Sequence, residues 1–363
     1  MFFLEESEII QLTKIRTAIS SDTSFSDLEK LCNEVASNLN DKGFAFTYTA
    51  SLLASKDLIE EAMKMFSQNK EDTFCSIMYD YLRETGSFKL ADKVFESADP
   101  YNIYTQTDFF KNHQEGALRH ILKFANETPQ PNSTEPITIL DIGVGNGVFI
   151  TKIVNEIIPL YDIKSIRLII LDQSEDMLRM AKKYCQENIK IQIEVITICC
   201  KIQDITKDQI EIIHKLKPIW FVNAGLSIHH MPWEKKIPML LNLRGFSAHL
   251  VLTEVNWNHD LPASYSPELF YSVAKSYGVF SESILHLSIS EERKKLCLNN
   301  FPIAEAINII KQPRANRIDY HTTIKEWKRI ADEAGFKTGE AEATYIYNNK
   351  PFAFVMEFKG KNN

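Results

Sequence analysis

The sequence of 363 residues lacks several features that would assign it to a specialised class of protein. Its six cysteines include no Cys-x-x-Cys pair, which argues against a structural zinc site or a disulfide framework and is typical of a reducing compartment. Basic residues do not outnumber acidic ones, and the formal net charge is −7. We therefore expect no nucleic-acid partner and no anionic membrane partner.

Long hydrophobic runs are also absent. No apolar stretch approaches the roughly 20 residues that a membrane-spanning helix needs. The start, Met1–Glu6, turns acidic without the positive flank and apolar region of a secretion signal. We expect a cytoplasmic protein, with export by a route that reads no N-terminal signal left open. Glycine and proline are few, and 44% of the residues are hydrophobic, so the chain can bury a sizeable core. The cysteines are interpreted as small core residues.

The N-terminal part shows helical spacing of apolar residues to about residue 98. Leu28, Cys32, Val35 and Leu39 form one such stripe. A further helix is predicted from Phe109 to Ala125. The sequence therefore predicts a helical N-terminal or cap region over residues 1–125. The proline-bearing segment 126–136 is interpreted as a linker.

After the linker, strand-like and helix-like segments alternate. This alternation predicts parallel strands with helical crossovers, a doubly wound α/β sheet covered on both faces. Strands are predicted at Ile137–Ile142, Arg167–Leu171, Gln192–Cys199, Ile219–Asn223 and His249–Val255, with helices at Gly147–Ile158, Glu175–Glu187, 206–216 and Trp233–Leu243.

The regular alternation stops after residue 256 and resumes near residue 321. A helix is predicted at Thr323–Ala334, followed by strands near Thr344–Tyr347 and Phe352–Phe358. We therefore expect an α/β domain formed by residues 137–256 and 321–363. The Ser-, Tyr- and Phe-bearing stretch 257–320 is expected to be a helical cap insertion.

The stretch "ILDIGVGNGVFI", residues 139–150, places an acid and three glycines between a strand and a helix. In an open α/β sheet, ligands bind beyond the carboxyl ends of the strands, and glycines let the main chain approach a ligand closely. A dinucleotide fingerprint needs G-x-G-x-x-G, but the third glycine would fall at Val148. The observed order is D-x-G-x-G-x-G. A tight turn with no ligand is the alternative.

That order resembles the first motif of class I S-adenosylmethionine-dependent methyltransferases. The resemblance implies that the glycine turn supports the methionine part of the cofactor, with an acid near its amino group. It also implies that the acid ending the next strand, in "LIILDQSEDML", accepts both ribose hydroxyls, and that residues after the second and third strands flank the adenine. The implied cofactor-binding residues are Asp141, Gly143, Gly145, Gly147, Asp172, Gln173, Met177, Gln203, Asp204 and Asn223.

The fourth predicted strand runs into "IWFVNAGLSIHHMP". The resemblance implies that Asn223 lies near the methyl group, with His229 and His230 just beyond it. A histidine can take a proton from a nucleophilic oxygen or nitrogen during methyl transfer if it comes within hydrogen-bond reach. Both histidines are candidate catalytic residues. The alternative is that the pair caps a helix or bonds within the core.

Later motifs resemble GRAS-domain proteins, which have the methyltransferase fold with a helical cap. The resembling stretches are "WFVNAGLSIHHM", "LTEVNWNHDLPASYSPELFYSVAKSYGVFSESIL", "RANRIDYHTTIKEWKRIADEAGF" and, before the linker, "YTQTDFFKNHQEGALRHI". Plant members are mainly transcription regulators and often have an altered glycine loop. This chain keeps the full loop and Asp172, as bacterial relatives tend to, and those relatives are presumed to methylate small molecules. The resemblance therefore favours an enzyme.

Residues after the fifth predicted strand are further candidates. Glu254 is a candidate catalytic residue, whereas Asn256, Trp257 and His259 are candidate substrate contacts, as is Tyr104 before the α/β region. A structural interpretation of these residues has equal weight. In that interpretation, Glu254 pairs with Arg314 or Arg317 to hold the insertion, and the aromatic residues belong to the core.

Together these motifs predict a metal-independent S-adenosylmethionine-dependent methyltransferase that acts on a small molecule by in-line displacement. A non-catalytic GRAS-type regulator that binds protein partners, with or without the cofactor, is the alternative from another class. A nicotinamide-dependent enzyme is the third reading, and Val148 argues against it.

Overall fold

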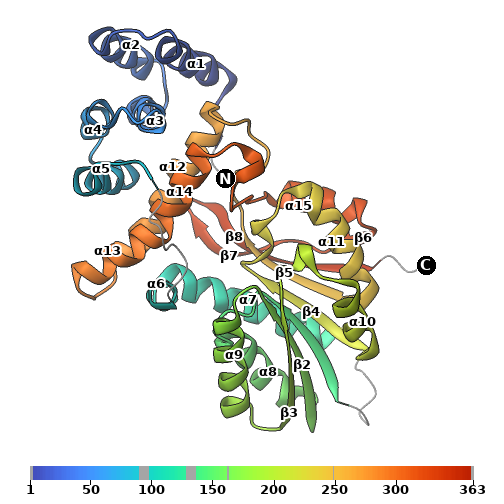
Figure 1. The fold of residues 1–363 in the computed structure, drawn as a ribbon. Coiled ribbons are helices and arrows are strands. Elements are labelled where there is room, and N and C mark those ends of the chain that lie inside the picture. Colours follow the sequence, from blue (N-terminus) through green and yellow to red (C-terminus); the bar gives the residue numbers. More distant parts are fainter. Residues whose placement is uncertain (1–2, 90–97, 128–135, 162, 248, 361–363) are drawn as a thin grey trace. The chain divides into compact units, whose positions relative to one another are not determined.

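The computed structural model describes residues 3–89, 98–127, 136–161, 163–247 and 249–360 (Figure 1). The chain divides into two compact units. One comprises Met1–Lys111 and Trp257–Tyr320, and is called the helical unit below. The other comprises Asn112–Asn256 and His321–Asn363, and is called the sheet unit.

The helical unit is built from helices contributed by both of its segments. Serine or aspartate side chains cap several of their first turns, as Ser24, Asp72, Ser266 and Ser290 do, by accepting a backbone N–H. The third helix is buried along most of its length, so it lacks the one-sided stripe that reveals a surface helix. The helices are α1 (Glu6–Ser20), α2 (Phe25–Ser37), α3 (Lys42–Ser55), α4 (Ile59–Ser67), α5 (Thr73–Thr85), α6 (Ala98–Tyr104), α12 (Pro267–Leu285), α13 (Glu291–Asn300) and α14 (Pro302–Lys311).

The sheet unit contains an eight-stranded mixed sheet in the order β3-β2-β1-β4-β5-β8-β6, with β7 paired to β8. The pairs from β3 to β5 are parallel, and β8 runs antiparallel to β5, β6 and β7. The predicted doubly wound α/β fold class is therefore confirmed. The strands are β1 (Ile137–Ile142), β2 (Ser165–Asp172), β3 (Gln192–Cys199), β4 (Ile219–Gly225), β5 (His249–Val255), β6 (Phe336–Thr338), β7 (Glu342–Tyr347) and β8 (Lys350–Gly360).

Helices cover both faces of this sheet, and alternate strand residues point to opposite faces. Ile139 packs in the hydrophobic cluster that includes α7, α8 and α9. The next residue, Leu140, packs in the cluster that includes α10, α11 and α15. These helices are α7 (Asp108–Glu127), α8 (Val148–Tyr161), α9 (Glu175–Asn188), α10 (Lys207–Lys215), α11 (Trp233–Phe246) and α15 (Ile324–Glu333). Burial on both faces explains the continuous apolar runs of β1, β4 and β5, whereas the edge strand β3 is half exposed.

Several details differ from the sequence-based expectation or extend it. The three-residue strand β6 had no periodic signal and was not predicted. Most of the predicted linker 126–136 lies outside the described residues, although α7 continues to Glu127. The cysteines are free, and Cys32, Cys75, Cys185 and Cys297 are buried as expected, but Cys199 is exposed. No helix within the described residues is long and apolar enough to cross a membrane.

Candidate active site

The strand order reverses direction at β1, whose neighbours are β2 on one side and β4 on the other. Ligands of doubly wound sheets bind outside the carboxyl ends of the strands at such a point. Asp141 near the end of β1 is in register with Asn223 of β4. Asp172 ends β2, and Glu254 lies one residue before the end of β5. Parallel pairing therefore places these polar side chains along one edge of the sheet.

The glycine loop follows β1 and is fixed by backbone contacts. The Gly143 N–H donates to the Leu171 carbonyl at 2.7 Å. Gly143, Gly145 and Gly147 all have positive φ, at 70°, 55° and 80°, a conformation that a Cβ atom disfavours.

Neighbouring atoms of the protein leave no room for a Cβ atom at two of these glycines. A Cβ at Gly143 would lie 2.3 Å from Cβ of Ser227, and one at Gly147 would lie 2.7 Å from Cα of Ala181. The sequence predicts that these glycines allow close approach of a ligand. At Gly143 and Gly147 the neighbouring residues of the protein already exclude a side chain.

The Asp172 side chain is held by the backbone around it. One carboxylate oxygen accepts the Gly145 N–H at 3.1 Å, and the other accepts the Ser174 N–H at 2.9 Å. Burial raises the pKa of Asp172, although these backbone donors oppose the shift. Each oxygen keeps lone pairs beyond these two bonds. The carboxylate is thus oriented by the glycine loop and remains able to accept further hydrogen bonds.

Asp141 is buried beside Asn223, whose Nδ2 donates to Asp141 Oδ1 at 2.6 Å. Burial raises the pKa of Asp141 to about 7; the Asn223 bond opposes this shift and the charge of Asp172 adds to it. No cationic side chain pairs with Asp141 among the described residues. The Asn223 Oδ1 atom is also buried, without a donor in the part of the chain that the structure describes. The pair therefore presents a carboxyl and a carbonyl oxygen that lack a positively charged donor.

The predicted adenine contacts lie near the same strand ends. Gln173 is exposed, and Met177 is partly buried in the first turn of α9. Gln203 and Asp204 lie in a short 3₁₀ helix, η1 (Ile202–Asp204), which follows β3 closely. The register of β2 and β3 pairs Asp172 with Cys199, and the Cys200 N–H donates to the Asp172 carbonyl at 3.0 Å. The chain therefore brings η1 to the strand end that carries Asp172.

Glu254 and His229 form a buried pair where β4 and β5 end. One carboxylate oxygen of Glu254 accepts the backbone N–H groups of Ile228 and His229, at 3.0 and 3.2 Å. The other lies 2.8 Å from His229 Nδ1. Burial alone would raise the pKa of Glu254, but the charge and hydrogen bond of His229, with the charge of Lys236, lower it. An ionised Glu254 accepts a hydrogen bond from Nδ1–H, and in a neutral His229 this leaves the acceptor lone pair on Nε2.

Two residues that the sequence did not single out, His321 and Lys236, act on this pair. The His321 ring stacks on His229 with centroids 4.4 Å apart. Lys236 of α11 is fully buried, donates to Thr322 Oγ1 at 2.6 Å and lies over the Trp327 ring. A lysine on a predicted amphipathic helix normally indicates the solvent face, so the sequence held no signal of this burial.

The turn that carries the histidines is also strained. Leu226 has a φ of 48°, rare for a residue with a Cβ, and its N–H donates to the Thr253 carbonyl at 2.8 Å. His229 and His230 follow in a short 3₁₀ helix, η2 (Ile228–His230). His229 is buried by its pairing with Glu254, whereas His230 is exposed. The two histidines therefore differ: the His229 ring is held by Glu254, whereas the His230 ring faces solvent.

The remaining candidates fall into the two units. Asn256 lies in the sheet unit, where its Oδ1 accepts the Ile324 N–H and its Nδ2 donates to the Pro351 carbonyl. In the helical unit, Tyr104 packs on Phe280 with centroids 4.7 Å apart. Trp257 and His259 both pack against Tyr277. The sequence therefore named residues that the structure distributes over both units.

One alternative for Glu254 is wrong. The sequence left open an ion pair between Glu254 and Arg314 or Arg317. Glu254 instead pairs with His229, and Arg314 pairs with Asp260 at 2.5 Å. Arg317 donates to the His259 carbonyl and to Ser264 Oγ. The two arginines therefore brace the helical segment after residue 256 from within the helical unit.

Comparisons with known proteins agree with the fold. No family model and no curated protein sequence matches this chain. The fold is similar to that of SCL7 from Oryza sativa, a GRAS protein, with a TM-score of 0.62 and 13% identity over 82% of this chain and 94% of that one. Magnesium protoporphyrin IX methyltransferase from Synechocystis PCC 6803, with bound SAH, matches at a TM-score of 0.44 and 12% identity, covering 79% of this chain and 99% of the other. The mixed sheet with helices on both faces is thus an architecture that this chain shares with SCL7.

Proposed function

We propose that this chain is an S-adenosylmethionine-dependent methyltransferase that binds its cofactor at the carboxyl edge of the sheet unit. The observation that carries the proposal is the buried Asp141–Asn223 pair. Both side chains present oxygen atoms to a buried place where the described residues supply no cation. An α-ammonium group would donate hydrogen bonds to both oxygens and would offset the cost of burying the carboxylate.

Asp172 supports the same assignment from the neighbouring strand. Its two oxygens are fixed by Gly145 and Ser174, and they retain lone pairs for two hydroxyl donors. A ribose presents two adjacent hydroxyls, so one carboxylate can accept both. We assign Gln173, Met177, Gln203 and Asp204 to the adenine side of the site, since they follow the same two strands.

The bound cofactor would supply a methyl group on a positively charged sulfur. The protein would then hold the acceptor and move a proton when the accepting atom must lose one. We propose that His229 takes this proton through Nε2, because Glu254 fixes Nδ1 as a donor. His321 and Lys236 act as positioning residues: His321 stacks on the imidazole, and the charge of Lys236 favours the ionised form of Glu254.

We further propose that the methyl acceptor is a small molecule. The net charge of −7 disfavours a nucleic acid. His229 is only 8% exposed and Glu254 only 1%, so the reacting atom of the acceptor must reach a recessed base. Trp257, His259 and Tyr104 stay candidate substrate contacts. Asn256 is assigned a structural role instead, because both ends of its amide bond the backbone.

Calorimetric titration with S-adenosylmethionine and S-adenosylhomocysteine tests the cofactor assignment. We expect saturable binding to the wild type, and about a hundredfold loss of affinity in Asp172→Ala, because two charge-assisted hydrogen bonds disappear. The matched control is Asp176→Ala, which removes an exposed acid from the first turn of α9 and should leave the affinity unchanged. Absence of binding by the wild type, or equal affinity of Asp172→Ala, would disprove the proposal. Preferential binding of NAD would favour a nicotinamide enzyme.

Methyl transfer itself is tested by following S-adenosylhomocysteine formation with a metabolite fraction as acceptor and, separately, a protein fraction. We expect turnover with the metabolite fraction, and its strong reduction in His229→Asn. Turnover with protein alone would overturn the small-molecule assignment. Cofactor binding with no turnover in either fraction would favour the regulatory alternative.

A further inference from the structure

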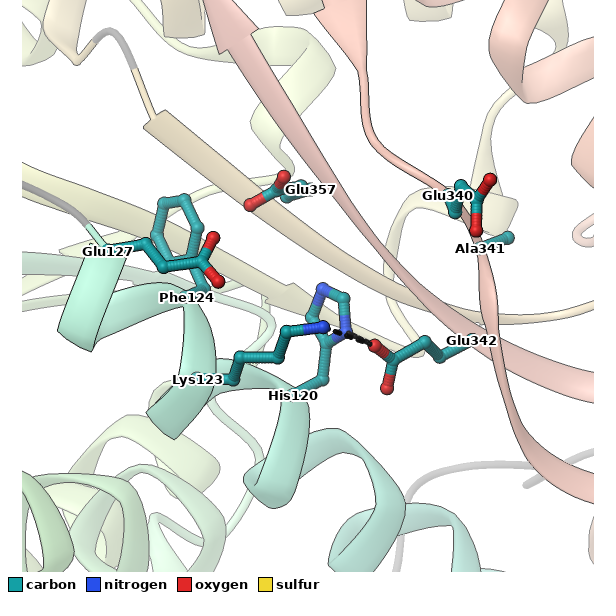
Figure 2. A pocket seen from close by; sticks show the side chains of 8 residues that line it. All are labelled: His120, Lys123, Phe124, Glu127, Glu340, Ala341, Glu342 and Glu357. Carbon is teal, nitrogen blue, oxygen red and sulfur yellow. Dashed lines mark hydrogen bonds and ion pairs between the residues drawn. The ribbon is translucent and has the colours of Figure 1, made fainter.

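A polar cavity lies in the sheet unit, lined by residues of α7, of residues 340–341 with the first residue of β7, and of β8 (Figure 2). Its volume is about 260 Å³. His113 holds α7 against β7 beside the cavity, because its Nδ1 lies 2.6 Å from Oγ1 of Thr344. Gly116 lies so close to the same threonine that an added Cβ would meet its Cα at 2.9 Å. The lining residues are His120, Lys123, Phe124, Glu127, Glu340, Ala341, Glu342 and Glu357.

The lining carries more negative than positive charge. Of its four glutamates, Glu342 pairs with Lys123 at 3.4 Å, and Glu357 pairs with the nearby Lys359 at 3.1 Å. Glu127 and Glu340 have no basic partner among the described residues. The cavity therefore retains two carboxylates whose charge the surrounding side chains leave unpaired.

His120 supplies an observation independent of the acidic side chains. The residue is only 6% exposed, and its Nδ1 lies 3.1 Å from Glu342 Oε1. Burial alone would raise the pKa of Glu342, but the bonds and charges of His120 and Lys123 lower it. The contact with Glu342 is one of charge and distance, because Nδ1 is buried without a hydrogen-bond partner among the described residues. Neither ring nitrogen of His120 has a hydrogen-bond partner in the described part of the chain, and Figure 2 shows Nε2 turned away from Glu342.

The arrangement of these groups indicates the form of the ligand. Figure 2 shows Glu127 and Glu340 on separate sides of the cavity, with the His120 ring between them. A single metal ion binds ligands that converge on one point, whereas separated carboxylates suit separated positive charges. The Phe124 ring offers an apolar wall that also attracts cations, as its contact with Lys359 illustrates.

We propose that this cavity binds a small aliphatic polyamine, whose ammonium groups contact Glu127 and Glu340 and donate to His120 Nε2. The site differs from the proposed cofactor site in its residues and does not depend on it. Because the glutamates lie at an open surface, binding should weaken as the salt concentration rises. The shared chemistry is a chain of separated ammonium groups, and spermidine serves as the probe.

Calorimetric titration of the full chain with spermidine at low salt tests this site. We expect saturable binding, about tenfold weaker in Glu127→Gln/Glu340→Gln, because two carboxylate contacts lose their charge. The control Glu156→Gln/Glu187→Gln removes the same charge from exposed positions of α8 and α9 and should change the affinity by less than about twofold. His120→Leu should also weaken spermidine binding. If this variant does not fold, the comparison of Glu127→Gln/Glu340→Gln with its control still tests the site.

Three outcomes would overturn the proposal. The first is no saturable binding of spermidine in the millimolar range, and the second is equal affinity of the double variant and its control. The third is tighter binding of Mg²⁺ than of spermidine with the same dependence on Glu127 and Glu340, which would assign the cavity to a metal ion. Butylamine, which carries a single ammonium, should bind more weakly than spermidine.

Discussion

Asp141 and Glu254 are both buried carboxyls near the ends of parallel strands, but their surroundings act on them in opposite ways. Asp141 bonds the amide of Asn223 and has no cationic partner among the described residues, so burial dominates and its pKa rises to about 7. Glu254 accepts two backbone N–H groups and pairs with His229, and these contacts outweigh its burial and lower its pKa. Burial thus has different consequences at the two strand ends.

The difference separates a binding site from a positioning site. A carboxyl without a counterion weakens the folded state whenever it ionises, and such a cost is retained where a ligand supplies the missing charge. A carboxyl whose partners are complete stabilises its neighbours and fixes their orientation. This difference supports the proposal that the cofactor binds at the β1–β4 end and that proton transfer takes place at the β4–β5 end. The predictions below test this division.

The largest expected effect is on the pH dependence of stability at Asp141. Its pKa is raised from 3.8 in the unfolded chain to about 7 in the folded one. The folded state then binds more protons between these values. The stabilisation is complete below pH 3.8 and is lost as the pH rises through 7. From pH 5 to 8 this group should cost about 3 kcal/mol of unfolding free energy.

Asp141→Asn removes this titration while retaining a polar side chain of the same shape. Urea unfolding at pH 5 and pH 8 should therefore show that the variant gains stability relative to the wild type as the pH rises. Comparing the two proteins at each pH cancels the contributions of all other groups. If the difference in unfolding free energy between the two proteins is the same at pH 5 and pH 8, Asp141 does not titrate with a raised pKa in the folded state.

The same acid-to-amide change at Glu254 should have the opposite sign. Glu254→Gln replaces an ionised acceptor of three hydrogen bonds, and it should lower the unfolding free energy by about 2 kcal/mol at pH 7. Asp141→Asn is the matched control, since both side chains are at most 5% exposed. Equal stability of Glu254→Gln and the wild type in urea unfolding would show that the pair with His229 contributes nothing.

Much of the sheet could be predicted from the sequence. The bounds of β1, β3 and β5 agree with the prediction at both ends. β1 and β5 are apolar runs, whereas β3 is recognised by its many β-branched residues. Once the strands are parallel, Asp141 and Asp172 must lie at one edge. The position of the candidate cofactor site therefore follows from local patterns alone.

The interior of the site could not be predicted in the same way. Glu254 and His229 lie 25 residues apart, and their pairing depends on the strained turn at Leu226 and on side-chain orientation. Lys236 is a charged residue whose burial depends on Thr322 and Trp327, distant in sequence. Local sequence patterns carry no information on such long-range contacts, so the sequence named both catalytic candidates without pairing them.

The smallest of the three effects concerns cofactor affinity, and it rests on the proposed function. A cationic ligand binds the ionised form of Asp141 in preference, so the affinity for S-adenosylmethionine should rise as the pH increases toward 7. Between pH 6 and 7.5 calorimetry should show a gain of several-fold, up to about tenfold, while an α-amino group stays largely protonated. In Asp141→Asn the affinity should be lower at pH 7.5 and nearly independent of pH. If both proteins bind S-adenosylmethionine with the same pH dependence, the cofactor assignment stands but Asp141 does not contact the α-ammonium group. Only a carboxyl that titrates in this pH range can make the pH dependence of the wild type differ from that of the variant.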